Sequence, residues 1–278
     1  MASPAMHTAT RYVQPLREGG SLPAVVDTDG GGMYVVKFRG AGQGVKSLIA
    51  ELIVGQLAGA AGLPAPDPAL IEIPEQFGRS EPDPEIQDLL RASHGINFGA
   101  RYLDGAFNFD GNAALDLISP ELAARIVWFD AYVSNPDRTH RNPNLMICGR
   151  KPYLIDHGAA IYAQHDWPSV DEARTRSPFQ MIEKHVLLER ASSVAEVDEE
   201  MVTRLSSGAI RAAVEAVPEQ WLMSPVVAAD FSGTEAAKDR YALYLETRLA
   251  GPRAFVSEAV EAQARASRMP VQRLKARR

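Results

Sequence analysis

The chain has few of the features that mark secreted, nucleic-acid-binding or membrane proteins. A single cysteine, Cys148, cannot form an internal disulfide, which is typical of proteins from a reducing compartment. Basic residues do not predominate: 29 Lys and Arg stand against 35 Asp and Glu, and the net charge of −6 argues against direct nucleic-acid binding through bulk electrostatics. The longest apolar run, residues 47–63, contains Glu51, Gln56 and three glycines, and is too polar to cross a bilayer.

The first residues also lack a targeting pattern. The segment MASPAMHTATRY does not place a basic stretch before an apolar one, as a secretory signal peptide does. Together with the lone cysteine, this predicts a cytoplasmic protein that binds neither nucleic acid nor membranes. The 278 residues suffice for one large domain or for two lobes with a sizeable core.

Strand patterns dominate the first hundred residues. Five strands are predicted, at residues 9–16, 22–27, 33–38, 69–73 and 96–103. Asp29-Gly30 between the second and third is a strong hairpin signal, so we expect the first three strands to pair successively as an antiparallel sheet. The segment 45–61 is apolar on nearly all faces, which predicts a helix that is covered by protein on every side.

Helical patterns dominate from about residue 113. A helix is predicted over 120–133, with Ser119 as its N-cap and Pro120 in its first turn. Later elements are two short strands at 144–148 and 153–155, and amphipathic helices at 179–188, 197–217 and 234–264. We therefore expect an α+β fold with two lobes. The first, over residues 1–104, would be an antiparallel sheet with one helix, and the second, over residues 105–278, would be mainly helical.

Two opposite charges lie in otherwise mainly apolar elements. Lys37 is the only charge in the strand MYVVKF, and Glu51 is the only acid in the helix over 45–61. Burying an ammonium group is costly unless the group is paired, so pairing of Lys37 with Glu51 is favoured over an exposed edge lysine. A strand lysine held by a helix glutamate is how protein kinases direct an amine at the α- and β-phosphates of a nucleotide.

Polar residues also gather beside the two later strands. The segment NPDRTHRNPN places Asp137 and Asn144 before one strand, and LIDHG places Asp156 after the next. An ordinary polar loop would look similar. However, an Asp followed by an Asn at the start of a strand is also a catalytic-loop pattern, in which the carboxylate accepts a hydroxyl proton and the amide oxygen binds Mg²⁺. Asp137 and Asp156 in one cleft would repel each other without a cation.

Taken in order, these features resemble the HipA-like kinases, most of all the compact members that lack the extra N-terminal part of HipA toxins. The resemblance lies within residues 10–250 and is carried by the segments YVVKF, AGLPAP, INFGARYL, NPDRTHRNPNLMI and YLIDHGAAIY. It implies a two-lobed protein-kinase-like fold that uses ATP and Mg²⁺ to transfer a phosphoryl group to a hydroxyl acceptor, above all a protein Ser or Thr. Asn135-Pro136-Asp137 in place of a His-Arg-Asp triplet sets the chain apart from conventional eukaryotic protein kinases.

The resemblance also implies a role for each polar feature. Lys37 would contact the α- and β-phosphates, with Glu51 orienting it. Asp137 would be the catalytic base, and Asp156 would bind Mg²⁺ beside His157, which replaces the usual Phe. Further nucleotide-binding residues would be Gly19, Gly20 and Ser21 over the phosphates, and Phe98, Arg101 and Leu103 along the hinge strand.

Two asparagines compete for the second magnesium position. Asn142 has the usual spacing from Asp137, whereas Asn144 has the usual place just before the strand. We favour Asn144 because the start of a strand fixes a side chain better than loop spacing does. Arg138 and Arg141 are expected near the phosphates.

Other functions stay open at this point. Nucleotidyl transfer or a non-catalytic nucleotide-binding regulator would fit the same motifs. A metal-dependent phosphohydrolase built on Asp156 and His157 would need further His and Asp ligands, which we do not find at suitable spacing. Trp167 is a weak candidate for a substrate-facing loop, and no motif indicates the acceptor substrate or a regulatory partner protein.

Overall fold

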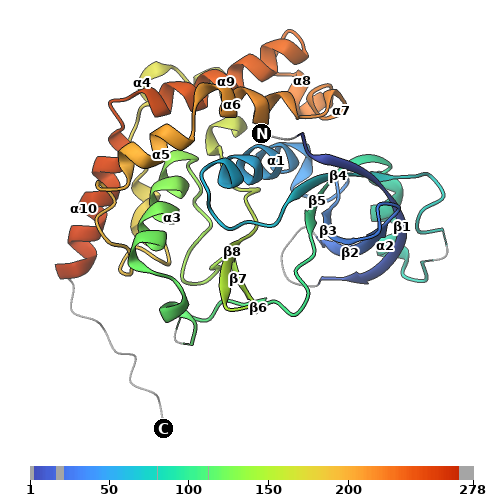
Figure 1. Ribbon diagram of the computed structural model, residues 1–278. Coiled ribbons are helices and arrows are strands. Elements are labelled where there is room, and N and C mark those ends of the chain that lie inside the picture. The colour runs from blue at the N-terminus through green and yellow to red at the C-terminus, as the bar shows by residue number, and fades with distance from the viewer. Residues whose placement is uncertain (1–2, 17–21, 80, 112, 269–278) are drawn as a thin grey trace.

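The structure is a computed structural model that describes residues 3–16, 22–79, 81–111 and 113–268 (Figure 1). It is a mixed α+β fold, as the sequence predicts, with strands in the first hundred residues and helices in most of the remainder. The strands are β1 (Ala5–Pro15), β2 (Ala24–Thr28), β3 (Met33–Lys37), β4 (Pro68–Ile73), β5 (Gly95–Arg101), β6 (Phe107–Asn108), β7 (Leu145–Cys148) and β8 (Lys151–Leu154).

The first five strands close into a barrel in the order β1-β2-β3-β5-β4. β1, β2 and β3 pair antiparallel in succession, as predicted. The expectation of a purely antiparallel sheet is wrong, because β1 runs parallel to β4 and this pairing closes the barrel. β1 begins at Ala5 rather than at residue 9, and the added residues supply the parallel ladder, from Ala5 opposite Ala69 to Thr8 opposite Glu72.

Side chains alternate between the inside and the outside of the barrel. The inward residues form a core of their own: Ala9, Ala24, Val26, Tyr34, Val36, Phe38, Ala69, Ile71, Ile73, Phe77 and Leu90. Because Tyr34 and Val36 point inward from β3, Val35 and Lys37 point outward. The polar end of Lys37 is thereby placed outside the barrel rather than within its apolar core.

Helix α1 (Gly44–Ala60) lies between the barrel and the helices of the second half (Figure 1). Fourteen of its seventeen residues are buried, which confirms the prediction of a helix covered on every side. It ends where Gly62 adopts a φ of 70° and Leu63 N donates to Ala58 O at 2.9 Å, a left-handed turn that favours glycine. The helix is therefore fixed by both halves of the molecule.

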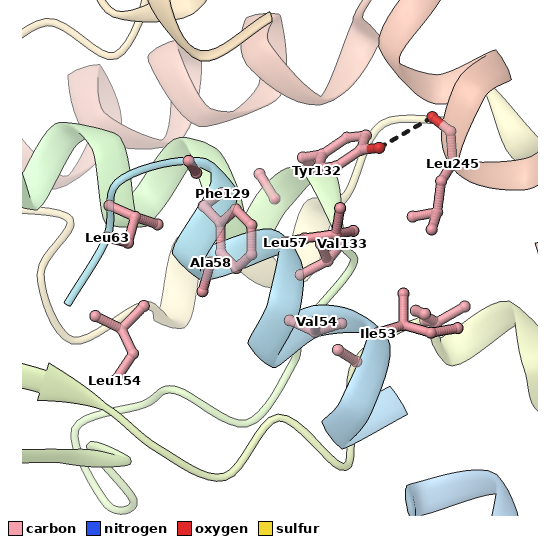
Figure 2. Packing of buried hydrophobic residues seen from close by; sticks show 14 of the residues in the cluster. Ile53, Val54, Leu57, Ala58, Leu63, Phe129, Tyr132, Val133, Leu154 and Leu245 are labelled. Carbon is pink, nitrogen blue, oxygen red and sulfur yellow. Dashed lines mark hydrogen bonds between the residues drawn. The ribbon is translucent and has the colours of Figure 1, made fainter. Parts of the chain in front are cut away.

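One apolar core joins α1 to the barrel wall and to the helices. Figure 2 shows part of it, with Leu57 and Ala58 of α1 packed near Phe129 and Tyr132 of α3 (Pro120–Tyr132). The outward side chain of Phe98 on β5 belongs to the same core. No helix of the described ranges combines the length and apolar character needed to cross a membrane.

The other helices and 3₁₀ turns mostly follow β8. They are α2 (Pro84–Ala92), η1 (Leu115–Leu117), η2 (Tyr162–His165), η3 (Trp167–Ser169), α4 (Glu172–Thr175), η4 (Gln180–Lys184), α5 (Asp198–Arg204), α6 (Ser207–Glu215), α7 (Glu219–Leu222), α8 (Pro225–Ala228), α9 (Thr234–Ala250) and α10 (Ala254–Arg268). Helix α3 begins as predicted, since the Ser119 side chain accepts a hydrogen bond from Leu122 N at 3.2 Å.

Three of the predicted long helices are shorter or broken. Residues 179–188 form only the 3₁₀ turn η4. The segment 197–217 is divided into α5 and α6, because Ser206 caps a new helix by accepting a hydrogen bond from Ala209 N at 3.3 Å. Pro252 separates α9 from α10, since proline has no N–H with which to continue a helix.

Candidate active site

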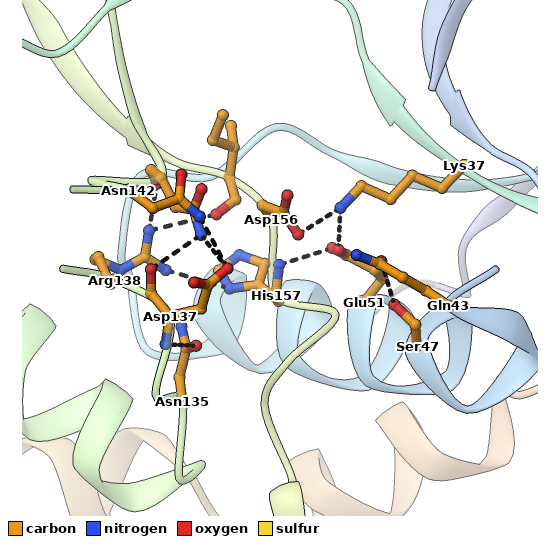
Figure 3. A network of polar contacts seen from close by, with 12 residues as sticks. Lys37, Gln43, Ser47, Glu51, Asn135, Asp137, Arg138, Asn142, Asp156 and His157 are labelled. Carbon is orange, nitrogen blue, oxygen red and sulfur yellow. Dashed lines mark hydrogen bonds and ion pairs between the residues drawn. The ribbon is translucent and has the colours of Figure 1, made fainter. Parts of the chain in front are cut away.

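Lys37 links three elements that lie far apart in the sequence (Figure 3). Its ammonium nitrogen is bonded to Oε1 of Glu51 on α1, as the sequence predicts. It also lies 2.6 Å from Oδ1 of Asp156, which follows β8. The Glu51 side chain is 2% exposed and that of Asp156 is 37% exposed, so the cluster is closed toward α1 and open on the side of Asp156.

The charges in this cluster are tuned by burial and by one another. Burial disfavours the ammonium form of Lys37, but Glu51 and Asp156 outweigh this effect, so the pKa of Lys37 is raised and the group stays charged. Burial would raise the pKa of Asp156, yet Lys37 holds it below its ordinary value. The pKa of Glu51 is raised, because full burial and neighbouring Asp156 outweigh the attraction of Lys37. Asp156 is thus the partly exposed acid and the more readily ionised of the two.

The segment after β8 is pressed against α1. His157 N donates to Oε2 of Glu51 at 2.9 Å, so each oxygen of that carboxylate has a partner. A Cβ atom at Gly158 would lie 2.2 Å from Oγ of Ser47 and 3.0 Å from Oε1 of Glu51, so only glycine permits this approach. Asp156 itself adopts a φ of 55°, a left-handed conformation that is uncommon outside glycine.

Asp137 lies within a compact turn that both candidate asparagines support. Asn142 Nδ2 donates to Asp137 Oδ2 at 2.9 Å, and Asn144 Nδ2 donates to the same oxygen at 3.2 Å. Asn142 is exposed, whereas Asn144 is 8% exposed and adopts a φ of 46°. Ile155 N donates to Asn144 O at 3.1 Å, which joins this loop to the segment that carries Asp156.

A fully buried ion pair lies beside this loop, and sequence reasoning missed half of it. Arg138 was expected near the phosphates, but its side chain has no exposure and bonds to Asp130 of α3 through Nε at 2.6 Å. Although burial alone would raise it, the pKa of Asp130 is held well below its ordinary value by Arg138 and His185. The signal for Asp130 was available, since it is the only acid in the second half of an apolar helix, as Glu51 is in α1.

His185 is a third buried member of this cluster. Its Nδ1 accepts a hydrogen bond from Leu187 N at 3.1 Å, so the proton of a neutral ring is on Nε2, which donates to Asp130 Oδ2 at 2.9 Å. Burial lowers its pKa, in keeping with a neutral ring. Trp167 does not face a substrate: it is 3% exposed and packs edge-on against Tyr241 and Tyr244.

A row of apolar side chains adjoins Lys37 on the outer face of the barrel. Phe98 lies directly opposite Lys37 in the β3–β5 ladder and therefore shares its face. Two positions along, Val35 is opposite Ala100, and Val35 is also opposite Val25 on β2. The period-two pattern of strands, counted from Lys37 on β3 and from Phe98 on β5, could have identified Val35 and Ala100 from the sequence.

Among the other residues predicted to bind the nucleotide, Arg101 does not share this face. Arg101 points to the opposite side of β5, with its guanidinium carbon 5.6 Å from the centre of the Tyr34 ring, and it lines a groove of about 690 Å³ that Lys37 does not line. Leu103 lies beyond the end of β5, and its carbonyl accepts from Ala106 N at 3.2 Å. Gly19, Gly20 and Ser21 lie outside the described residues.

The oxygen atoms around Asp156 and the loop suit a hard divalent cation. Asp156 is partly exposed and ionised. The amide nitrogen of Asn144 donates a hydrogen bond to Asp137, which leaves the amide oxygen of Asn144 for a cation. Carboxylate and amide oxygens are what Mg²⁺ takes from proteins, which usually supply only a few of its ligands. The part of the chain that the structure describes contains no group of three or more His, Cys, Asp and Glu side chains suited to a metal.

Comparisons with known proteins place these features in one family. Residues 10–240 match a family model described as HipA-like kinase. Among solved structures, the chain is similar to the crystal structure of a Helicobacter pylori proinflammatory kinase, CtkA, with a TM-score of 0.54, 11% sequence identity and coverage of 96% of this chain and 100% of that chain. At this identity the likeness shows the fold alone. No curated protein matches the chain.

Proposed function

The chain belongs to the HipA-like kinase family, and we propose that it transfers the γ-phosphoryl group of ATP, with Mg²⁺, to the hydroxyl group of a protein serine or threonine. Phosphotransfer in general follows from the family. The observation that supports the use of ATP and Mg²⁺ is the contact of Lys37 with both Glu51 and Asp156. In kinases, the lysine–glutamate pair and the metal-binding aspartate must both be in place for transfer.

The proposed layout has two lobes, residues 1–104 and residues 105–278, with the nucleotide between them. The outer face of the barrel would form one side of the nucleotide cleft. On that face, Phe98, Val35 and Ala100 would pack against the adenine ring. Lys37 extends from the same face toward the phosphates, and Glu51 holds its amine in place. Gly19, Gly20 and Ser21 would lie over the phosphates, as the sequence suggests.

The metal would be held by Asp156 and an asparagine. Bound Mg²⁺ bridges the β- and γ-phosphate oxygens and neutralises charge that develops during transfer. Asn144 is favoured over Asn142 because its backbone oxygen is bonded to Ile155 N, directly before Asp156. Its 8% exposure and left-handed backbone fix its amide in one orientation, whereas Asn142 is exposed.

Asp137 would accept the proton of the acceptor hydroxyl. Its Oδ2 already receives hydrogen bonds from Asn142 and Asn144, which orient the carboxylate. A carboxylate so held can present its other oxygen, Oδ1, to a hydroxyl group. The choice of a protein Ser or Thr as acceptor rests on the family resemblance, and a cytoplasmic location and a regulatory partner stay predictions from the sequence.

Calorimetric titration of the full chain with ATP tests the proposal, in the presence of Mg²⁺ and again with a chelator. We expect saturable binding that Mg²⁺ strengthens, and the absence of nucleotide binding would rule the proposal out. Intact mass of the protein and of candidate acceptors after incubation with ATP then decides the reaction. A phosphate increment supports phosphoryl transfer, an AMP increment shows nucleotidyl transfer, and binding without either favours a non-catalytic regulator.

A further inference from the structure

Arg138 follows the proposed catalytic base in the sequence but is turned into the protein. Its side chain has no exposure, in a loop whose neighbouring residues, His140 and Arg141, are exposed. A buried guanidinium needs partners for its donors, since unpaired burial of a charge is costly. The hydrogen-bond partners of Arg138 therefore indicate its role.

The guanidinium contacts the segments that carry the proposed metal ligands Asn144 and Asp156 (Figure 3). Nη1 donates to the backbone oxygen of Asn144 and, at 3.3 Å, to that of Ile155, which directly precedes Asp156. Nη2 lies 3.4 Å from Nδ1 of His157, which can only accept from it. One side chain thus connects the Asp137 loop, the start of β7 and the segment after β8.

Two of these contacts fall beside strained backbone. Asn144 and Asp156 are non-glycine residues with φ values of 46° and 55°, and such conformations persist only where the surrounding structure enforces them. Arg138 binds the carbonyl of Asn144 and the carbonyl of the peptide that enters Asp156. The orientation of both proposed metal ligands therefore depends on the same guanidinium.

Asp130 anchors the guanidinium from the rigid helix α3. Its Oδ2 accepts from Arg138 Nε at 2.6 Å and from His185 Nε2 at 2.9 Å, and its Oδ1 accepts from Asn135 Nδ2 at 3.0 Å. The carboxylate is thus fixed from three sides by the loop and by the segment that follows η4. Because Asp130 is fully buried and held in this way, it can fix Arg138 in turn.

We propose that Arg138, anchored by Asp130, is a positioning residue that holds Asn144 and Asp156 at the spacing needed to share one magnesium ion. This deepens the proposed function and rests on it for the identity of the metal. The role requires arginine: a planar guanidinium reaches several acceptors in fixed directions, whereas a lysine ammonium would keep the charge opposite Asp130 and lose the two carbonyls.

Arg138→Lys therefore separates positioning from charge. The matched control is Arg248→Lys, because Arg248 is another buried arginine that donates to backbone oxygens, those of Ala131, Tyr132 and Thr175, without contacting the Asp156 segment. The first measurement is calorimetric affinity for ATP with Mg²⁺ and with a chelator. We expect Arg138→Lys to reduce the increase in ATP affinity that Mg²⁺ provides by about 10–100-fold, the usual effect of losing a partner that orients a metal ligand. The affinity of this variant for ATP without Mg²⁺ should stay at the wild-type level, and so should the Mg²⁺-dependent increase in Arg248→Lys.

The second measurement is hydrogen exchange of the nucleotide-free proteins. Amides in residues 137–144 and 154–158 should exchange faster in Arg138→Lys than in Arg248→Lys. Asp130→Asn keeps the shape of the anchor but removes its charge, and it should change both measurements in the same direction. This variant replaces Arg138→Lys in both measurements if Arg138→Lys does not fold. The proposal would be overturned if Mg²⁺ increased the ATP affinity of the Arg138 and Arg248 variants equally and if their amides exchanged at equal rates. If the wild-type protein binds no MgATP, the proposed function fails, and the exchange comparison alone decides the positioning role.

Discussion

The ammonium nitrogen of Lys37 lies 2.6 Å from Oδ1 of Asp156, although 119 positions of the chain separate the two residues. The same nitrogen is bonded to Glu51, so one cation joins β3, α1 and the segment after β8. The proposed nucleotide-binding lysine is therefore already in contact with both carboxylates that a kinase needs at this place. Each of the three groups depends on the other two for its charge and position.

Removing this cation should destabilise the fold strongly. Lys37→Met leaves the carboxylate of Glu51 buried and unpaired, so we expect the free energy of unfolding to fall by about 3–5 kcal/mol in urea denaturation. Adding Glu51→Leu should recover much of this loss, because an apolar pair can replace a buried ion pair at little cost. As a control, Arg211→Met breaks the exposed pair with Glu246 and should cost about 0–1 kcal/mol. If Lys37→Met and Arg211→Met lowered the free energy of unfolding equally, burial of the Lys37 pair would make no difference to its contribution.

The two aspartates of the site should fail in different ways. Asp137→Asn removes the proposed proton acceptor and should lower turnover by about 10²–10⁴-fold while MgATP still binds. Asp156→Asn removes a proposed metal ligand and should abolish the increase in ATP affinity that Mg²⁺ provides. Calorimetry and a phosphotransfer assay on both variants separate these effects. Full turnover by Asp137→Asn would assign the base to another group.

The two asparagines can be distinguished in the same way. Asn144→Ala should weaken Mg²⁺ binding at saturating ATP by at least about tenfold, because it removes a proposed ligand and leaves alanine at a positive φ. Asn142→Ala should have a smaller effect, limited to the orientation of Asp137. Magnesium titrations of phosphotransfer measure both. The opposite ranking would transfer the metal role to Asn142.

The close approach at Gly158 gives a prediction with its own rescue. Gly158→Ala would bring a methyl group to 2.2 Å from Oγ of Ser47, so we expect overpacking to cost about 1–3 kcal/mol of stability and to disturb the Lys37 cluster. Ser47→Ala removes that oxygen, and the double variant should regain a large part of the stability. Thermal unfolding of the two single variants and the double variant measures the coupling. Strictly additive losses would mean that the two residues do not meet.

Buried His157 should make stability depend on pH. Burial and the nearby Arg138 lower its pKa from 6.5 to about 3 in the folded protein. Because the folded pKa lies below that of the unfolded chain, the unfolded state binds the extra proton. The stabilisation is fully present above pH 6.5 and is lost as the pH falls toward 3, by up to about 1.4 kcal/mol per pH unit.

Denaturation of the nucleotide-free protein across this pH range measures how steeply the free energy of unfolding depends on pH. His157→Phe has no titrating ring and should flatten the profile in the part of the window above the carboxylate range. His140→Gln changes an exposed histidine of the same loop and should leave the profile as it is. An unchanged slope in His157→Phe would locate the dependence in other groups, of which His185, whose pKa burial also lowers, is the first to examine.

Sequence patterns were sufficient where a residue type has few physical solutions. A lone ammonium in an apolar strand and a lone carboxylate in an apolar helix favour burial as partners, and Lys37 and Glu51 are in contact. Ser119 and Pro120 similarly define the start of α3, because their preferences are local. Helix breaks were harder to predict, since the amphipathic pattern continues across Ser206 and Pro252.

Local patterns in the chain predict the α+β composition, the buried helix α1, the charge pair and the loop motif that resembles the HipA-like kinases. Three further features depend on long-range packing: β1 closes a barrel against β4, Arg138 is buried against Asp130, and Arg101 lies off the face that Lys37 and Phe98 share. The reason is physical. Local patterns record propensity and burial, whereas a charged side chain in a polar loop can equally face solvent, a ligand or a distant carboxylate. That choice is made by whichever partner the packed chain brings within hydrogen-bonding distance.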